Sequence, residues 1–94
     1  MNLDTRLEVS SSVVTREIGG EIVLMDLDSG TYFGLDSVGA RAWLAIEDGQ
    51  TIEDLCTQLE QEFEVSPEQL RQDISALVSK LLEHNLVTAK DDRF

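Results

Sequence analysis

The chain has 94 residues, of which 41% are hydrophobic, and its 19 acidic and 7 basic side chains give a formal net charge of −12 at pH 7. This length predicts one domain over residues 1–94 with an ordered core at about 7–88, and the absence of both a membrane-spanning apolar run and a secretory signal predicts a cytoplasmic protein. An acidic surface of this kind repels a phosphate backbone, so nucleic-acid binding is disfavoured.

Three β-strands are predicted in the first third of the chain. The segment VVTREI at 13–18 is rich in β-branched residues and ends at a glycine pair, and EIVLMDL at 21–27 follows it. A tight hairpin turn is expected at 28–30, with Gly30 in a left-handed conformation. The segment TYFGL at 31–35 is then the returning strand, which completes an antiparallel meander.

The remainder of the chain is predicted to be helical. A first helix, SVGARAWLAIED, is capped by Asp36 or Ser37 and ends at Gly49. A second helix begins at Thr51 with the capping box TIED, in which Asp54 takes the third helical position.

The third helix is predicted from Pro67 to about Asn85, with Ser66 as its N-cap. At 3.6 residues per turn its apolar side chains occupy an arc of roughly 100°. The arc contains Leu70, Ile74, Leu77, Val78, Leu81 and Asn85. Its borders are formed by Asp73, Lys80 and His84 on one side and by Arg71, Ser75 and Leu82 on the other. Three strands followed by three helices predict an α+β, winged-helix-like fold.

Catalytic and metal-binding patterns are missing from the sequence. His84 and Cys56 are the one histidine and the one cysteine, and neither has a partner at a recognisable spacing. No nucleophile elbow, phosphate loop, dinucleotide fingerprint or zinc-protease motif occurs. We therefore expect no enzyme activity, no cofactor and no metal. Winged-helix domains often bind DNA, but the third helix is at best electrically neutral, which counts against that function.

The last predicted strand has the features of an open sheet edge. TYFGL contains neither the lysine nor the proline with which proteins usually block such edges. Gly34 has no side chain and would let another backbone come close. A peptide could therefore add as a fourth strand, bordered by the third helix if that helix packs beside this edge. Phe33 and Leu35 are expected in the core, which leaves Tyr32 as the better candidate for a groove residue.

The segment from 23 to 87 resembles the PqqD-like family of recognition elements for ribosomally made, later modified peptides. The resemblance is carried by the order and spacing of several elements and covers about residues 7–88. These elements are Tyr32 and Leu35, Gly39, Trp43, Gly49-Gln50-Thr51, Asp73-Ile74, and Leu81 with Leu86-Val87.

The resemblance implies a function that composition does not. The protein would be a non-catalytic adaptor that binds the leader segment of a precursor peptide by strand addition to the third strand, in a cleft bordered by the third helix. The implied peptide-binding residues are Thr31, Tyr32, Phe33, Gly34, Leu35, Asp73, Ile74, Leu77, Val78 and Lys80. The favoured partner is a lasso-peptide leader protease. Three alternative functions of the protein remain. It could be a peptide chaperone for a radical enzyme in pyrroloquinoline-quinone assembly, a winged-helix nucleic-acid-binding module, or a dimerisation module that uses the same edge strand.

Overall fold

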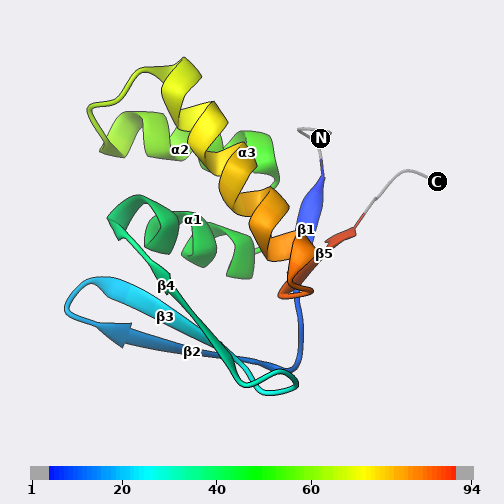
Figure 1. The fold of residues 1–94 in the computed structure, drawn as a ribbon. Coiled ribbons are helices and arrows are strands. Elements are labelled where there is room, and N and C mark those ends of the chain that lie inside the picture. The colour runs from blue at the N-terminus through cyan, green and yellow to red at the C-terminus, as the bar shows by residue number, and fades with distance from the viewer. Residues whose placement is uncertain (1–4, 91–94) are drawn as a thin grey trace.

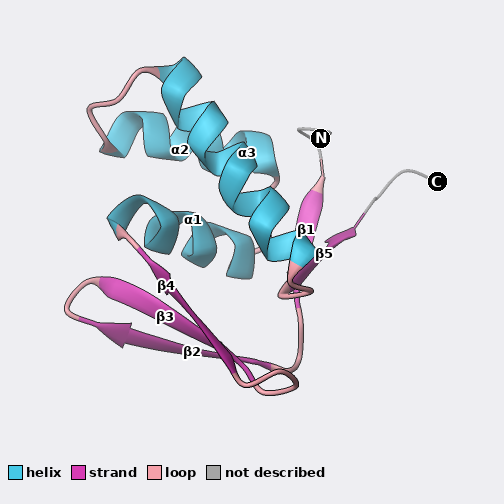
Figure 2. Ribbon diagram, viewed as in Figure 1, coloured by secondary structure: helices cyan, strands magenta, loops and turns pink. Residues whose placement is uncertain are grey.

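The computed structural model describes residues 5–90 as two small sheets and three helices (Figure 1). The larger sheet contains β2 (Val13–Ile18), β3 (Glu21–Asp26) and β4 (Thr31–Leu35), antiparallel and in that spatial order. The helices α1 (Ser37–Glu47), α2 (Ile52–Glu62) and α3 (Pro67–Glu83) follow, and they lie to one side of this sheet (Figure 2). The predicted α+β fold, a three-stranded antiparallel sheet followed by three helices, is confirmed.

A second sheet joins the two ends of the described chain. It contains β1 (Arg6–Val9) and β5 (Val87–Lys90), which pair antiparallel. The sequence analysis did not predict this pairing, which joins segments about 80 positions apart. Each strand has only four residues, and no turn connects the two strands in sequence. Their local sequences therefore gave no indication that they pair. Leu7 and Val87 are buried, so this sheet closes one side of the core.

The helix starts follow the predicted caps. Asp36 accepts a hydrogen bond from the Gly39 N–H at 2.8 Å, which leaves Asp36 rather than Ser37 as the N-cap of α1. Ser66 caps α3 by accepting from the Gln69 N–H at 3.1 Å. Side chains of this kind satisfy N–H groups that have no partner in the first helical turn. Because α1 begins two residues after β4, its first turn lies at the end of that strand.

The end of α3 differs from the prediction. The helix ends at Glu83 with His84 as its C-cap, and Asn85 has a positive φ of 60°. Asn85 is therefore outside the apolar arc and is exposed, contrary to the prediction that it continues the helix. Asparagine tolerates the left-handed conformation better than most residues do. The reversal lets the Leu86 N–H donate to the Leu81 carbonyl oxygen at 2.9 Å and sends the chain into β5.

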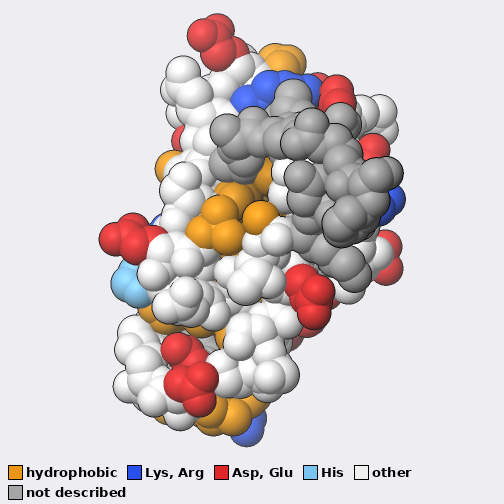
Figure 3. Space-filling view, turned by 90° about the vertical axis from the view of Figure 1, so that its right-hand side faces the viewer, with side chains coloured by type: hydrophobic (Ala, Val, Ile, Leu, Met, Phe, Trp, Pro, Cys, Tyr) orange, Lys and Arg blue, Asp and Glu red, His pale blue; other side chains and the backbone are white. Residues whose placement is uncertain are grey.

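The core lies between the larger sheet and the helices. Trp43 of α1 is fully buried and packs in a cluster with apolar side chains of every layer. The largest of these are Ile22, Leu24, Leu55, Leu59, Leu70, Ile74, Leu81 and Leu86. On the face drawn in Figure 3, Asp and Glu side chains are spread over the surface rather than gathered in one place. Within residues 5–90, no helix combines the length and the apolar character that crossing a membrane requires.

Candidate functional site

Strand β4 is an edge strand. All five of its residues pair with β3, in a register that places Leu35 opposite Ile22 and Phe33 opposite Leu24. On its other side, no strand of residues 5–90 pairs with it. Gly34 has open space where a Cβ would stand. The edge therefore presents backbone N–H and C=O groups that another extended chain could use.

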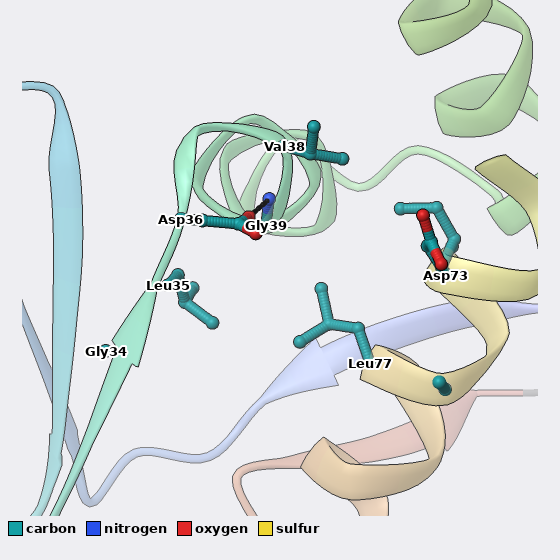
Figure 4. Close-up of a pocket in the computed structure, with 9 residues that line it drawn as sticks. Gly34, Leu35, Asp36, Val38, Gly39, Asp73 and Leu77 are labelled. Carbon is teal, nitrogen blue, oxygen red and sulfur yellow. Dashed lines mark hydrogen bonds between the residues drawn. The ribbon is translucent and has the colours of Figure 1, made fainter. Parts of the chain in front are cut away.

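A pocket lies along this edge, between β4 and the first turn of α1 on one side and α3 on the other. Its volume is about 400 Å³. Its lining residues are Gly34, Leu35, Asp36, Val38, Gly39, Asp73, Ile74, Ala76 and Leu77. Figure 4 shows the side chains of Leu35 and Leu77 pointing toward one another across the space. We call the pocket together with the β4 edge the β4–α3 groove.

One border of α3 faces this groove. At 100° per residue, Asp73, Leu77, Lys80 and His84 fall within an arc of roughly 60°. Asp73 and Leu77 line the pocket, and the His84 ring lies against the Phe33 ring with centroids 4.8 Å apart. Lys80 lies between these contacts on the same arc. The opposite border turns away toward α2, where Arg71 Nε lies 3.4 Å from a carboxylate oxygen of Glu60.

The groove combines an apolar floor with a charged rim. Leu35 and Ile74 are buried, while Leu77 and Val38 are half-buried and remain partly available. On the rim, Asp73 accepts a hydrogen bond from the Gln69 side-chain amide at 2.9 Å. Such a site suits an extended peptide, because the strand edge binds the backbone and the apolar floor binds alternate side chains.

The predicted site residues of β4 divide between the two faces of the sheet. Side chains alternate along a strand, so Phe33 and Leu35 face the helices while Tyr32 and Gly34 face away. Tyr32 is 68% exposed and does not line the pocket, although the sequence favoured it as a groove residue. Thr31 lies at the exposed start of the strand. Of the five predicted β4 residues, Gly34 and Leu35 line the pocket, and Thr31, Tyr32 and Phe33 do not.

The predicted residues of α3 also divide. Asp73, Ile74 and Leu77 line the pocket. Lys80 is exposed on the facing border, beyond the pocket itself. Val78 is only 1% exposed and belongs to the core, where it holds α3 against the rest of the fold.

The structure adds lining residues that the sequence did not select. They are Asp36, Val38 and Gly39 of the β4–α1 junction and Ala76 of α3. The sequence did contain a signal for the junction residues. The predicted edge strand is followed directly by a capped helix, so the first turn of that helix must lie at the end of the strand. A Cβ on Gly39 would lie 3.3 Å from Asp36 Oδ1 and 3.4 Å from the Leu35 Cβ, so this close packing favours glycine.

Neither Cys56 nor His84 lines the pocket. Within residues 5–90, no cluster of three or more His, Cys, Asp or Glu side chains is arranged to hold a metal ion. Cys56 is buried in α2, and its burial raises the pKa of the thiol. The ring of His84 is in contact with Phe33.

Comparisons with known proteins agree with this geometry. Residues 21–87 match the family PqqD, described as coenzyme PQQ synthesis protein D. Among solved structures, the chain is similar to "TbiB1 in Complex with the TbiA(beta) Leader Peptide", with 33% sequence identity and a TM-score of 0.82. The alignment covers 90% of the present chain and 99% of the TbiB1 chain. A lasso peptide synthetase B1 complexed with the leader peptide is 26% identical, covers 88% of this chain and 98% of that chain, and has a TM-score of 0.80. No curated protein gave a significant match.

The chain belongs to the PqqD family, because the family match spans well over half of its length. The resemblance inferred from the spacing of its sequence elements is thereby confirmed. Both similar structures are proteins with a bound leader peptide, which supports a PqqD-like recognition element of this kind.

Proposed function

We propose that this protein is a non-catalytic adaptor that binds the leader segment of a ribosomally made precursor peptide as a fourth strand on β4. The observation that carries the proposal is the unpaired edge of β4, bordered by the groove-facing side of α3. The two similar structures hold leader peptides, which gives the ligand class. The adaptor delivers the bound leader to a separate enzyme that cuts or modifies the rest of the peptide.

The geometry favours a short extended ligand. Five residues of β4 span roughly 17 Å at about 3.4 Å per residue, so an added strand of similar length would use the whole edge. Every second side chain of that strand would enter the groove and meet Leu35 and Leu77. The contact residues we propose are Thr31, Tyr32, Phe33, Gly34, Leu35, Asp73, Ile74, Leu77 and Lys80, and Val78 supports them from the core.

We favour a leader protease of lasso-peptide biosynthesis as the enzyme partner. The likeness to a lasso peptide synthetase B1 spans 88% of this chain and 98% of that one, so the two proteins share their whole architecture. A division of labour follows, in which this chain supplies peptide affinity and the partner supplies the catalytic groups.

The test is a titration of the backbone amide NMR spectrum with the leader half of a precursor peptide, to be sought among the genes that neighbour this one. We expect the largest shifts in residues 31–35 and along the border of α3 that contains Asp73 and Leu77. Strand addition also predicts slowed amide exchange in β4 at saturation. A variant on the outer sheet face, Val14→Ala, is the matched control and should bind equally well, because Val14 lies on β2, at the opposite edge of the sheet from the β4–α3 groove.

Two results would count against the proposal. Unchanged spectra at millimolar peptide would exclude leader binding. Shifts that appear on raising the concentration of the protein alone would instead indicate that β4 pairs with a second copy of the chain.

A further inference from the structure

The end of the groove near Leu35 carries negative charge. Asp36 and Asp73 both line the pocket there. Asp36 Oδ1 accepts the N–H of Gly39, and Asp73 Oδ1 accepts the side-chain amide of Gln69. The second carboxylate oxygen of Asp73 accepts no hydrogen bond from any residue between 5 and 90, and no basic side chain of that range pairs with it. Asp73 therefore keeps both charge and acceptor capacity for a ligand.

The other end of the groove carries a positive charge. Lys80 lies one turn beyond Leu77 and one turn before His84, on the arc of α3 that faces β4. The contact between His84 and Phe33 fixes this end of the helix beside the strand. Across the described part of the chain, no acidic side chain forms an ion pair with Lys80. Lys80 is exposed on this arc, so its ammonium group is available to a ligand, on a protein that is otherwise strongly acidic.

The distance between these two charges along α3 is close to the distance between two side chains four positions apart in a bound strand. Asp73 and Lys80 are seven residues apart, which is a rise of about 10.5 Å along α3. Same-side residues of an extended peptide recur about every 6.8 Å, so positions i and i+4 span about 14 Å. The length of lysine and glutamate side chains accommodates the difference. Position i+2 then meets the apolar floor between Leu35 and Leu77.

We propose that the groove selects a segment whose groove-facing side chains, at alternate positions, are basic beside Asp73, apolar against Leu35 and Leu77, and acidic beside Lys80. This inference rests on the proposed leader-binding function and specifies the chemistry of the bound segment. The charge of −12 attracts basic peptides from any direction, whereas the ordered pair of Asp73 and Lys80 sets the register.

The test is a binding scan with the same leader half of the precursor peptide. Each residue in turn is replaced by Lys, Glu and Gln, and the dissociation constant is measured by fluorescence anisotropy at 50 mM and 500 mM salt. The scan is run on the natural protein and on the variants Asp73→Asn and Lys80→Gln. Glu68→Gln and Arg71→Gln are the matched controls, because these residues lie on α3 away from the groove-facing arc.

We expect one peptide position that prefers Lys over Glu by about three- to tenfold, as a partly exposed ion pair would give, and that loses this preference in Asp73→Asn. Four positions away, a second position should prefer Glu and should lose that preference in Lys80→Gln. Both preferences should persist in the control variants and weaken at 500 mM salt.

The two proposals fail in different ways. If the peptide binds and shifts the β4 amides but the charge preferences are the same in all variants, the charge pattern is wrong and leader binding stands. If no peptide of the scan binds, leader binding fails and the charge pattern fails with it.

Discussion

The ring of His84 lies against the ring of Phe33, with centroids 4.8 Å apart and ring planes inclined by 55°. His84 is the C-cap of α3, and Phe33 is the central residue of β4. The contact therefore joins the two walls of the β4–α3 groove at one end. Aromatic pairs of this kind contribute about 0.5–1.5 kcal/mol beyond the burial of their area.

Replacing His84 should loosen the groove more than it destabilises the fold. We expect His84→Ala to lower leader affinity about two- to tenfold, because the end of α3 is no longer held at a fixed distance from β4. His84→Phe keeps a ring and should restore most of the affinity. Isothermal titration calorimetry with the leader peptide measures the effect, and equal affinity of the natural protein and the alanine variant would contradict it.

Asp26 should make the protein sensitive to acid. Its burial alone would raise the pKa, but hydrogen bonds from the Asp28 N–H and from the Ser29 and Ser12 hydroxyls outweigh this and hold the pKa below its ordinary value of 3.8. A carboxyl whose pKa is lower in the folded state stabilises the fold above its ordinary pKa. That stability is lost as the pH falls through the lower, folded-state value.

Thermal melts between pH 2 and pH 7 measure this contribution. The natural protein should lose melting temperature on acidification, and Asp26→Asn should start lower at pH 7 and change less with pH. Asp28→Asn removes an exposed carboxylate of the same turn and is the control. Parallel curves for the natural protein and Asp26→Asn would show that this carboxylate does not stabilise the fold.

The left-handed residue after α3 should resist substitution by anything but glycine. Asn85 has a φ of 60°, so Asn85→Ala should lower the free energy of unfolding by about 1 kcal/mol. Asn85→Gly fits this backbone freely and should change stability by less than about 0.5 kcal/mol. Urea denaturation measures both variants. Equal losses in both would mean that the side chain rather than the conformation is required.

The thiol of Cys56 should be unreactive while the protein is folded. Its side chain is 1% exposed, and burial raises the pKa, which keeps the thiol protonated. A disulfide reagent should therefore modify Cys56 only at the rate at which the protein opens, and at once in denaturant. Immediate stoichiometric labelling of the native protein at pH 7 would contradict this.

Much of the fold could be predicted because its local signals agree. The turn at Gly30, the caps at Asp36, Thr51 and Ser66, and the period of α3 each define an element without reference to the others. The pairing of β1 with β5 could not be predicted, because the local sequence of neither strand indicates which distant segment it pairs with. The end of α3 was misplaced because Asn85 has the correct helical spacing and the wrong backbone conformation.

The candidate site was predictable in outline but not in its details. The sequence identified the edge strand and both borders of α3, yet the choice between the borders depended on how α3 packs. The contacts of Asp73 and Leu77 with the pocket, and of His84 with Phe33, made that choice. Tyr32 was favoured for its chemistry, but the strict alternation of β4 places its side chain on the outer face.

The pairing of Arg6 with Lys90 makes the described chain almost a closed ring. A short linker between these two strands would close the ring covalently, and new ends could then be opened at the exposed Gly19-Gly20 turn. Such a circular permutant would carry β3, β4, α1, α2 and α3 as one unbroken run. Its folding rate would show how much chain connectivity contributes to folding. Its affinity for the peptide should be unchanged, because the β4–α3 groove is kept intact.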